Sequence, residues 1–142
     1  MSFELHPQLA RDTFPVASLA LSELLLMNDA RFPWCILVPR VADVSEWHHL
    51  PADLQGTVMA EISAVSNVLE RLPGITKLNV GALGNRVPQL HIHVLGRHPE
   101  DAAWPDPVWG FGTPEAYSTD AAARLTERLR TALTNEASAD GG

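Results

Sequence analysis

Cysteine is almost absent from this chain of 142 residues. Cys35, the single cysteine, lies in the apolar run WCILVP, so an internal disulfide is excluded and a reducing compartment is compatible with the sequence. Its position in that run favours a buried, inert thiol over a reactive one.

Positive charge is also scarce. Ten Lys and Arg residues are outnumbered by 17 Asp and Glu residues, which gives a formal net charge of −7 and a pI near 5.2. Nucleic-acid polymers and anionic membranes bind clustered Lys and Arg, so neither is an expected partner. A phosphate ligand would have to be held by a few local donors.

Long apolar segments are missing as well. No run approaches the roughly 20 residues of a membrane-spanning helix, and the start MSFELHPQLARDTF lacks the basic and then apolar order of a signal peptide. A cytoplasmic protein is therefore expected. With 46% apolar residues the chain can still build a hydrophobic core, and its length predicts one domain.

Apolar patterning in the first half predicts a hairpin and a helix. Segments 20–29 and 33–40 are short, apolar and bounded by turn signals, which indicates two paired strands. Between residues 51 and 72, apolar side chains recur at three- and four-residue steps and end before Pro73 and Gly74. That pattern is typical of an amphipathic helix.

The second half repeats this mixture. Segments 76–83 and 89–96 are predicted to form a second hairpin. Apolar residues at four-residue steps predict a C-terminal helix over 121–133, with Ser118 and Thr119 as its candidate N-caps. Strands combined with separate helices predict the α+β class with an antiparallel sheet.

One domain is expected over residues 1–134, followed by a disordered tail at 135–142. Residues 98–117, rich in Pro and Gly, are expected to form an extended surface segment rather than a linker. Trp104 and Trp109 of this segment need a partner surface, and a dimer seam is favoured over stacking on a base.

Two histidines, His91 and His93, stand two positions apart in the predicted strand 89–96. Alternate side chains of a strand point to opposite faces, so both rings are expected on the face away from the helix, projecting outward into a groove. A neutral imidazole offers one nitrogen as a nucleophile and the other as a donor. Attack on phosphorus would replace one difficult displacement by two easier ones.

Small residues and amides precede the two histidines. Asn79, Gly81, Gly84 and Asn85 can let donor groups, including backbone N–H groups, approach an anion closely. The spacing of the histidines alone does not decide their role, because a solvated strand face could carry the same pair. This neighbourhood favours a phosphate site.

The segment NVGALGNRVPQLHIHVLGR resembles the histidine triad (HIT) family of nucleotide hydrolases and transferases, whose motif is His-φ-His-φ-His-φ-φ with φ apolar. The resemblance extends back through LLLMNDARFPWCILVPR and covers about residues 1–110. It is closest to a bacterial branch with Gln-Leu-His-φ-His and a downstream Trp-Pro, described as diadenosine-tetraphosphate-hydrolase-like. It implies a HIT-like sheet with a long central helix, a homodimer, and no required cofactor or metal.

The resemblance also implies roles for individual residues. His91 would be the nucleophile on the α-phosphate of a dinucleoside polyphosphate or nucleoside phosphoramidate, and His93 would contact the phosphate or the leaving group. Asn79 and Asn85 match positions that hold phosphate oxygens, and Asn28 matches the position beside the ribose.

Gln89 departs from the family motif, because it stands where the first histidine belongs. Its amide can still donate and accept hydrogen bonds, so altered tuning of the neighbouring rings is expected rather than inactivity. The uridylyltransferase branch of the family instead has Gln at the last histidine, so His93 argues against that reaction.

Two other classes of function stay open. His91, His93, His98 and Glu100 together look like the ligand set of a cupin-type metal protein, although two strong helices argue against an all-β barrel. The third hypothesis is a module that binds a nucleotide without turnover, and Gln89 in place of the first histidine adds weight to it. Turnover that survives a chelator would distinguish the enzyme from both.

Overall fold

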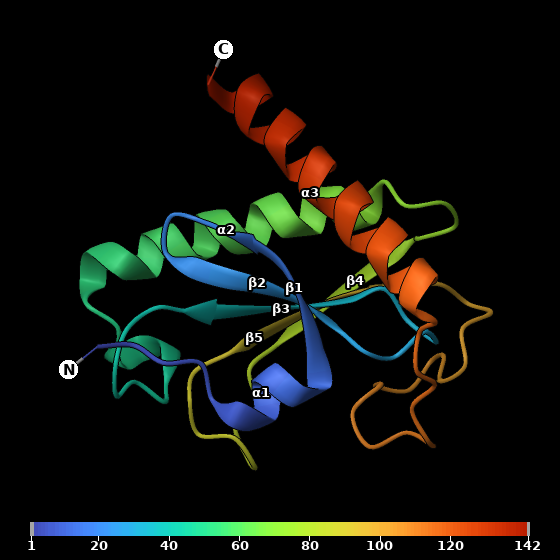
Figure 1. The fold of residues 1–142 in the computed structure, drawn as a ribbon, viewed down its shortest axis with the longest axis horizontal. Coiled ribbons are helices and arrows are strands. Elements are labelled where there is room, and N and C mark those ends of the chain that lie inside the picture. Colours follow the sequence, from blue (N-terminus) through green and yellow to red (C-terminus); the bar gives the residue numbers. More distant parts are fainter. Residues whose placement is uncertain (1, 142) are drawn as a thin grey trace.

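Five strands and three α-helices make up residues 2–141, the part of the chain that the computed structural model describes (Figure 1). In chain order the elements are α1 (Pro7–Asp12), β1 (Thr13–Ser18), β2 (Ser22–Met27), β3 (Trp34–Pro39), the 3-10 turn η1 (Trp47–His49), α2 (Ala52–Glu70), β4 (Lys77–Gly81), β5 (Ile92–Arg97) and α3 (Thr119–Gly141). The predicted α+β class is confirmed.

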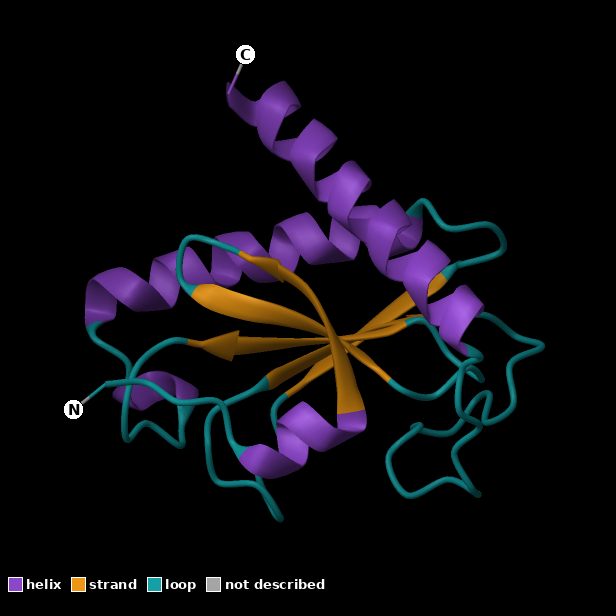
Figure 2. Ribbon diagram, viewed as in Figure 1, coloured by secondary structure: helices purple, strands orange, loops and turns teal. Residues whose placement is uncertain are grey.

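The strands form one antiparallel sheet in the order β1-β2-β3-β5-β4. Pairing of β2 with β3, and of β4 with β5, confirms both predicted hairpins. Since β5 lies between β3 and β4, His93 is paired with Ile36 on one side and with Gly81 on the other. The histidine strand is therefore internal to the sheet, and Figure 2 shows the sheet flanked by helices.

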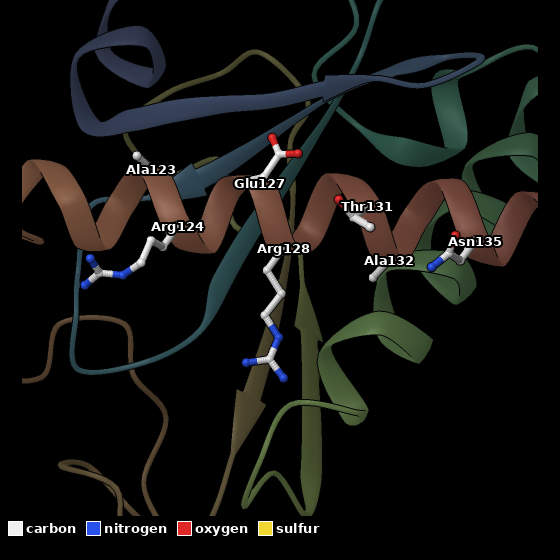
Figure 3. Close-up of a pocket in the computed structure, with 7 residues that line it drawn as sticks. All are labelled: Ala123, Arg124, Glu127, Arg128, Thr131, Ala132 and Asn135. Atoms are coloured by element: carbon white, nitrogen blue, oxygen red, sulfur yellow. The ribbon is translucent and has the colours of Figure 1, made fainter.

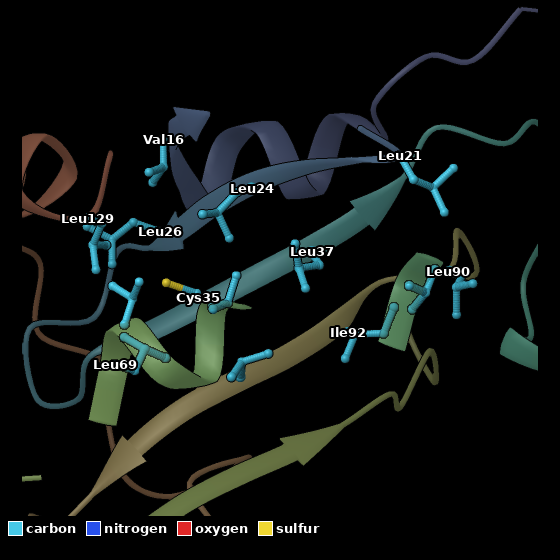
Figure 4. Close-up of a cluster of buried hydrophobic side chains, with 14 of the residues drawn as sticks. Val16, Leu21, Leu24, Leu26, Cys35, Leu37, Leu69, Leu90, Ile92 and Leu129 are labelled. Carbon is cyan, nitrogen blue, oxygen red and sulfur yellow. The ribbon is translucent and has the colours of Figure 1, made fainter. Parts of the chain in front are cut away.

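The main hydrophobic core lies between the sheet and α2. Alternate apolar residues of β2, β3 and β5 face this helix, whose own stripe includes Val65 and Leu69, and Leu129 of α3 closes one side (Figure 4). Helix α2 begins after Pro51 and ends at Arg71, close to the predicted limits. Its apolar stripe faces the sheet, which is what the three- and four-residue spacing predicts.

A second apolar cluster covers the opposite face of the sheet. Phe32, Trp34, Ile36 and Leu95 pack there against Leu9 of α1 and against residues that follow β5. Every residue of β3 is buried, because both of its faces are covered. Helix α1, strand β1 and this second layer were not predicted from the sequence.

Helix α3 starts where the sequence predicts, because the Ser118 hydroxyl accepts a hydrogen bond from the N–H of Ala121 at 3.1 Å. The helix then continues through residues 135–141, where the sequence predicts a disordered tail, and its last turns extend beyond the rest of the molecule (Figure 1). Residue 142 lies outside the described residues. None of the described helices is long and apolar enough to cross a membrane.

Candidate active site

His91 and His93 lie together at the start of β5. The strand begins at Ile92, so His91 immediately precedes it, and the two ring centroids are 5.0 Å apart. Both rings are on the face away from α2, as the alternation predicts. The expected outward projection is wrong, because His91 is only 7% exposed and His93 only 5%. In the second apolar layer on that face, Trp34 and Trp109 lie against the His93 ring.

Part of this layer comes from residues 98–117, which we call the strap. Ala103 and Val108 of the strap are buried in the second apolar cluster. The Trp109 ring lies edge-on against the His93 ring, with centroids 5.5 Å apart. Trp109 therefore packs against its own chain, and Trp104 is 37% exposed. The dimer seam stays a prediction for both tryptophans.

The hydrogen bond of His91 sets its tautomer. Its Nδ1 lies 2.7 Å from the main-chain carbonyl oxygen of Gln89. A carbonyl oxygen can only accept, so Nδ1 must carry the proton in the neutral ring. The lone pair is then on Nε2, which makes Nε2 the nucleophilic atom of this histidine.

His93 has the opposite tautomer. The indole Nε1–H of Trp34 donates to Nδ1 of His93 at 2.9 Å, so in the neutral ring Nε2 carries the hydrogen. Burial and the nearby His91 lower the pKa of His93 to about 4. At neutral pH His93 is therefore an uncharged donor beside a nucleophilic ring. The contribution of Trp34 was not predicted from the sequence.

Gln89 is held by the N-terminal segment. Its amide Nε2 donates to the carbonyl of Glu4 at 2.8 Å, and its Oε1 accepts from the N–H of His6 at 2.9 Å. No described hydrogen bond joins its side chain to a histidine ring. The bond to His91 comes from the main chain of Gln89, so it does not depend on the side chain at this position.

The half-buried Asn79 is hydrogen-bonded to the buried Arg97. The Asn79 Oδ1 accepts from Arg97 at 2.8 Å and its Nδ2 donates to the carbonyl of Leu78, so both amide atoms expected to hold phosphate are occupied. Arg97 is 2% exposed. It forms a salt bridge to Asp101 at 2.6 Å and donates to the carbonyl of Asp106, both in the strap. Arg97 thus fixes the strap to the sheet.

Asn28 lines a pocket of about 220 Å³ that neither histidine lines. Its side-chain oxygen accepts from the N–H of Tyr117 at 2.8 Å. Trp34 also lines this pocket and contacts His93, so it connects the pocket to the ring pair. Gly84 and Asn85 lie in the exposed loop between β4 and β5, and no described contact joins them to either ring.

A larger surface depression, of about 660 Å³, lies elsewhere and is formed by α3 alone. Figure 3 shows the Arg124 and Arg128 side chains extending from the same side of that helix. No histidine or cysteine lines the depression. Among the described residues no group of three His, Cys, Asp or Glu side chains is placed to share a metal ion. The cupin-type ligand set is not assembled among the described residues, since Glu100 is 89% exposed and lies against His98 rather than against His91 or His93.

Comparisons with known proteins agree with this geometry. The family model of the HIT domain matches residues 10–100 of the chain. This chain belongs to the histidine triad family.

Crystal structures of other histidine triad proteins have the same fold. The protein blr8122 from Bradyrhizobium japonicum is 41% identical, with a TM-score of 0.91 over 94% of this chain and 99% of the other. A histidine triad protein from Marinobacter aquaeolei VT8 is 43% identical, with a TM-score of 0.91 over 95% and 98%. The protein SMc02904 from Sinorhizobium meliloti 1021 is 41% identical, with a TM-score of 0.89 over 91% and 96%. The comparison with curated proteins gives no match.

The buried His93 predicts that this histidine triad protein loses stability in mild acid. Its pKa is about 4 in the folded chain and 6.5 in a model peptide, so the unfolded chain binds more protons between these values. The free energy of unfolding therefore has its full value above about pH 6.5 and falls as the pH is lowered toward 4. Urea unfolding at pH 7.5, 5.5 and 4.5 measures this loss. In His93→Gln, whose amide can accept from Trp34, the free energy of unfolding should depend less on pH than in the wild type. Parallel pH profiles for the two proteins would contradict the assignment of this dependence to His93.

Proposed function

We propose that this protein is a nucleotide hydrolase or transferase that cleaves at an α-phosphate through a nucleotidyl-histidine intermediate. The observation that carries the proposal is the pair of opposite tautomers. A carbonyl oxygen at 2.7 Å leaves Nε2 of His91 unprotonated, and an indole N–H at 2.9 Å leaves the hydrogen on Nε2 of His93. One ring can attack while the other donates.

The reaction has two displacements at phosphorus. Nε2 of His91 forms a bond to the α-phosphorus while the bond from phosphorus to the leaving oxygen or nitrogen breaks. His93 donates a hydrogen bond to the phosphate or to the leaving atom. Water then attacks the phosphorus, the phosphorus–nitrogen bond breaks, and a nucleoside monophosphate and free His91 result. The chemistry uses imidazole and water alone, so the proposal requires no metal or cofactor.

Burial of the two rings supports this chemistry because it keeps His93 uncharged at neutral pH. Since His91 is 7% exposed, side chains on this face must move apart before a phosphate reaches its Nε2. The pocket beside Asn28 and Trp34 is the proposed site of the nucleoside, with Asn28 beside the ribose.

Gln89 is compatible with activity. The bond that sets the tautomer of His91 comes from a main-chain carbonyl, which any residue at position 89 supplies. We therefore propose that its side chain positions the N-terminal segment through Glu4 and His6.

Gly84 and Asn85 remain proposed contacts of the phosphate. A cytoplasmic location, compatible with the unpaired thiol of Cys35, is part of the same proposal.

A homodimer is the proposed assembly. An apolar groove of about 230 Å³ between α2 and β4 includes the exposed side chains of Trp47, Met59 and Val80. Exposed apolar surface of this kind marks protein interfaces, and a two-fold pair is the commonest oligomer. Met59→Glu should shift the sedimentation coefficient from that of a dimer to that of a monomer, whereas Met27→Glu, away from this groove, should not. A monomeric wild-type protein would refute the assembly.

The test of function uses purified protein with diadenosine tetraphosphate and with an adenosine phosphoramidate, each with and without EDTA. We expect hydrolysis that survives the chelator, together with a transient adenylate adduct in the intact mass. Hydrolysis lost with EDTA would support a metal enzyme instead. Tight binding without turnover would support a nucleotide sensor.

A further inference from the structure

Trp109, in the strap, lies against the rings of both His93 and Trp34. Its indole ring meets the His93 ring edge-on, at 5.5 Å between centroids and an interplanar angle of 79°. It meets the Trp34 ring in the same way, at 6.3 Å and 87°. Trp109 therefore adjoins the ring that donates and the residue that sets its tautomer.

The indole N–H of Trp109 is a buried donor with no acceptor. Its Nε1 has no hydrogen-bond partner among residues 2–141, whereas the equivalent atom of Trp34 donates to His93. An unpaired buried donor costs about 1–3 kcal/mol, and folded proteins pair nearly all such groups. A phenylalanine would fill this apolar layer without that cost. The N–H is thus explained by an acceptor that a ligand brings.

The position of Trp109 is fixed from several sides. Arg97 binds the strap at Asp101 and at the carbonyl of Asp106, and the neighbouring Val108 is 2% exposed. On the sheet side Gly81 leaves room for the ring, because a Cβ at that position would lie 3.3 Å from Cη2 of Trp109. A side chain held in this way is suited to present a donor at a defined point.

We propose that the N–H of Trp109 donates a hydrogen bond to an oxygen of the substrate phosphate that binds beside His93. This inference rests on the proposed function and adds a residue to it. The site would then hold the phosphate with two uncharged donors, Nε2–H of His93 and Nε1–H of Trp109, rather than with a cation. Arg97, the nearby buried cation, is already engaged by Asp101 and Asn79.

The first arm of the experiment removes only the N–H. Trp109 is replaced by β-(3-benzothienyl)alanine, which has nearly the same shape with sulfur in place of N–H, and in parallel by phenylalanine. We expect kcat/KM for diadenosine tetraphosphate to fall by about 10- to 100-fold, the order expected when one donor to a developing charge is lost. Trp104→Phe is the matched control, since Trp104 lies in the same strap at 37% exposure, and its rate should stay within about twofold of wild type.

The second arm is independent of turnover. In ¹⁵N–¹H spectra the indole N–H resonance of Trp109 is identified by its loss in Trp109→Phe, and adenosine monophosphate is then added to the wild-type protein. We expect a downfield shift of this resonance as it gains a phosphate acceptor. The resonance of Trp34, which bonds His93 rather than substrate, reports occupancy of the same site.

The outcomes separate this inference from the function on which it rests. Full kcat/KM in the benzothienyl protein, or a Trp109 resonance that stays still while that of Trp34 moves, would overturn the role of Trp109 alone. If the wild-type protein neither hydrolyses the substrates nor responds to adenosine monophosphate, the proposed function fails and this inference fails with it. If Trp109→Phe proves unstable, the near-isosteric replacement gives the deciding rate.

Discussion

His91→Asn is expected to lower turnover of diadenosine tetraphosphate by about 10⁴-fold or more, the order seen when a covalent nucleophile is removed. Asparagine keeps an N–H that can donate to the Gln89 carbonyl, which His91 contacts at 2.7 Å, but it has no atom that can replace Nε2. The melting temperature should change by only a few degrees, since the side chain stays polar and the apolar layer is untouched. Steady-state kinetics and thermal unfolding measure the two effects.

His98→Asn provides the matched control for that result. His98 lies one residue beyond β5 and contacts the exposed Glu100, so the same substitution there should leave turnover unchanged. The adenylate adduct in the intact mass should persist in His98→Asn and vanish in His91→Asn. An active His91→Asn protein, or an adduct that remains in it, would show that another group attacks the phosphorus.

The two hairpins and both long helices could be predicted because each carries its own local pattern. The step of three and four between residues 51 and 72 specifies a helix face. Alternation places His91 and His93 on one face whatever the rest of the chain does. These predictions needed no knowledge of distant contacts, and the sheet pairing confirms the two hairpins.

Burial of the histidine face could not be predicted, because it depends on segments far apart in the sequence. The N-terminal segment reaches Gln89 across 83 to 85 residues, and the strap has irregular backbone with no periodicity. One signal was nevertheless present. The run WCILVP of β3 is apolar without alternation, which is typical of a strand covered on both faces and therefore of a second apolar layer.

The contacts of the residues expected to face the ligand could not be predicted from local sequence patterns either. The sequence marks Asn79 as an amide near the histidines, but its partner in the fold is Arg97, which the sequence gives no reason to bury. Only the four-residue spacing from Arg97 to Asp101 hinted at an ion pair. The burial of Arg97 depends on the strap folding back over the sheet, and the strap in turn depends on Arg97.

Arg97→Met is expected to destabilise the protein by about 3–5 kcal/mol, the range for breaking a buried ion pair by removing one partner. Methionine has similar length and no charge, so the Asp101 carboxylate, 2% exposed, would lose its counter-ion. The strap would also lose its bond at the carbonyl of Asp106. Urea unfolding at pH 7.5 measures the change, and turnover should fall too because Trp109 is no longer held against His93.

Arg40→Met tests whether burial causes this effect. Arg40 pairs with Glu23 at 3.3 Å and donates to the carbonyls of Leu19 and Ala20, but both charged side chains are about 30% exposed, so the loss there should be smaller, about 1–2 kcal/mol. The double variant with Arg97→Met and Asp101→Asn should recover part of the stability, since asparagine keeps an acceptor for the strap N–H groups without an unpaired charge. Equal losses in Arg97→Met and Arg40→Met would mean that the strap is held by its apolar contacts and that Arg97 has no special part in placing Trp109.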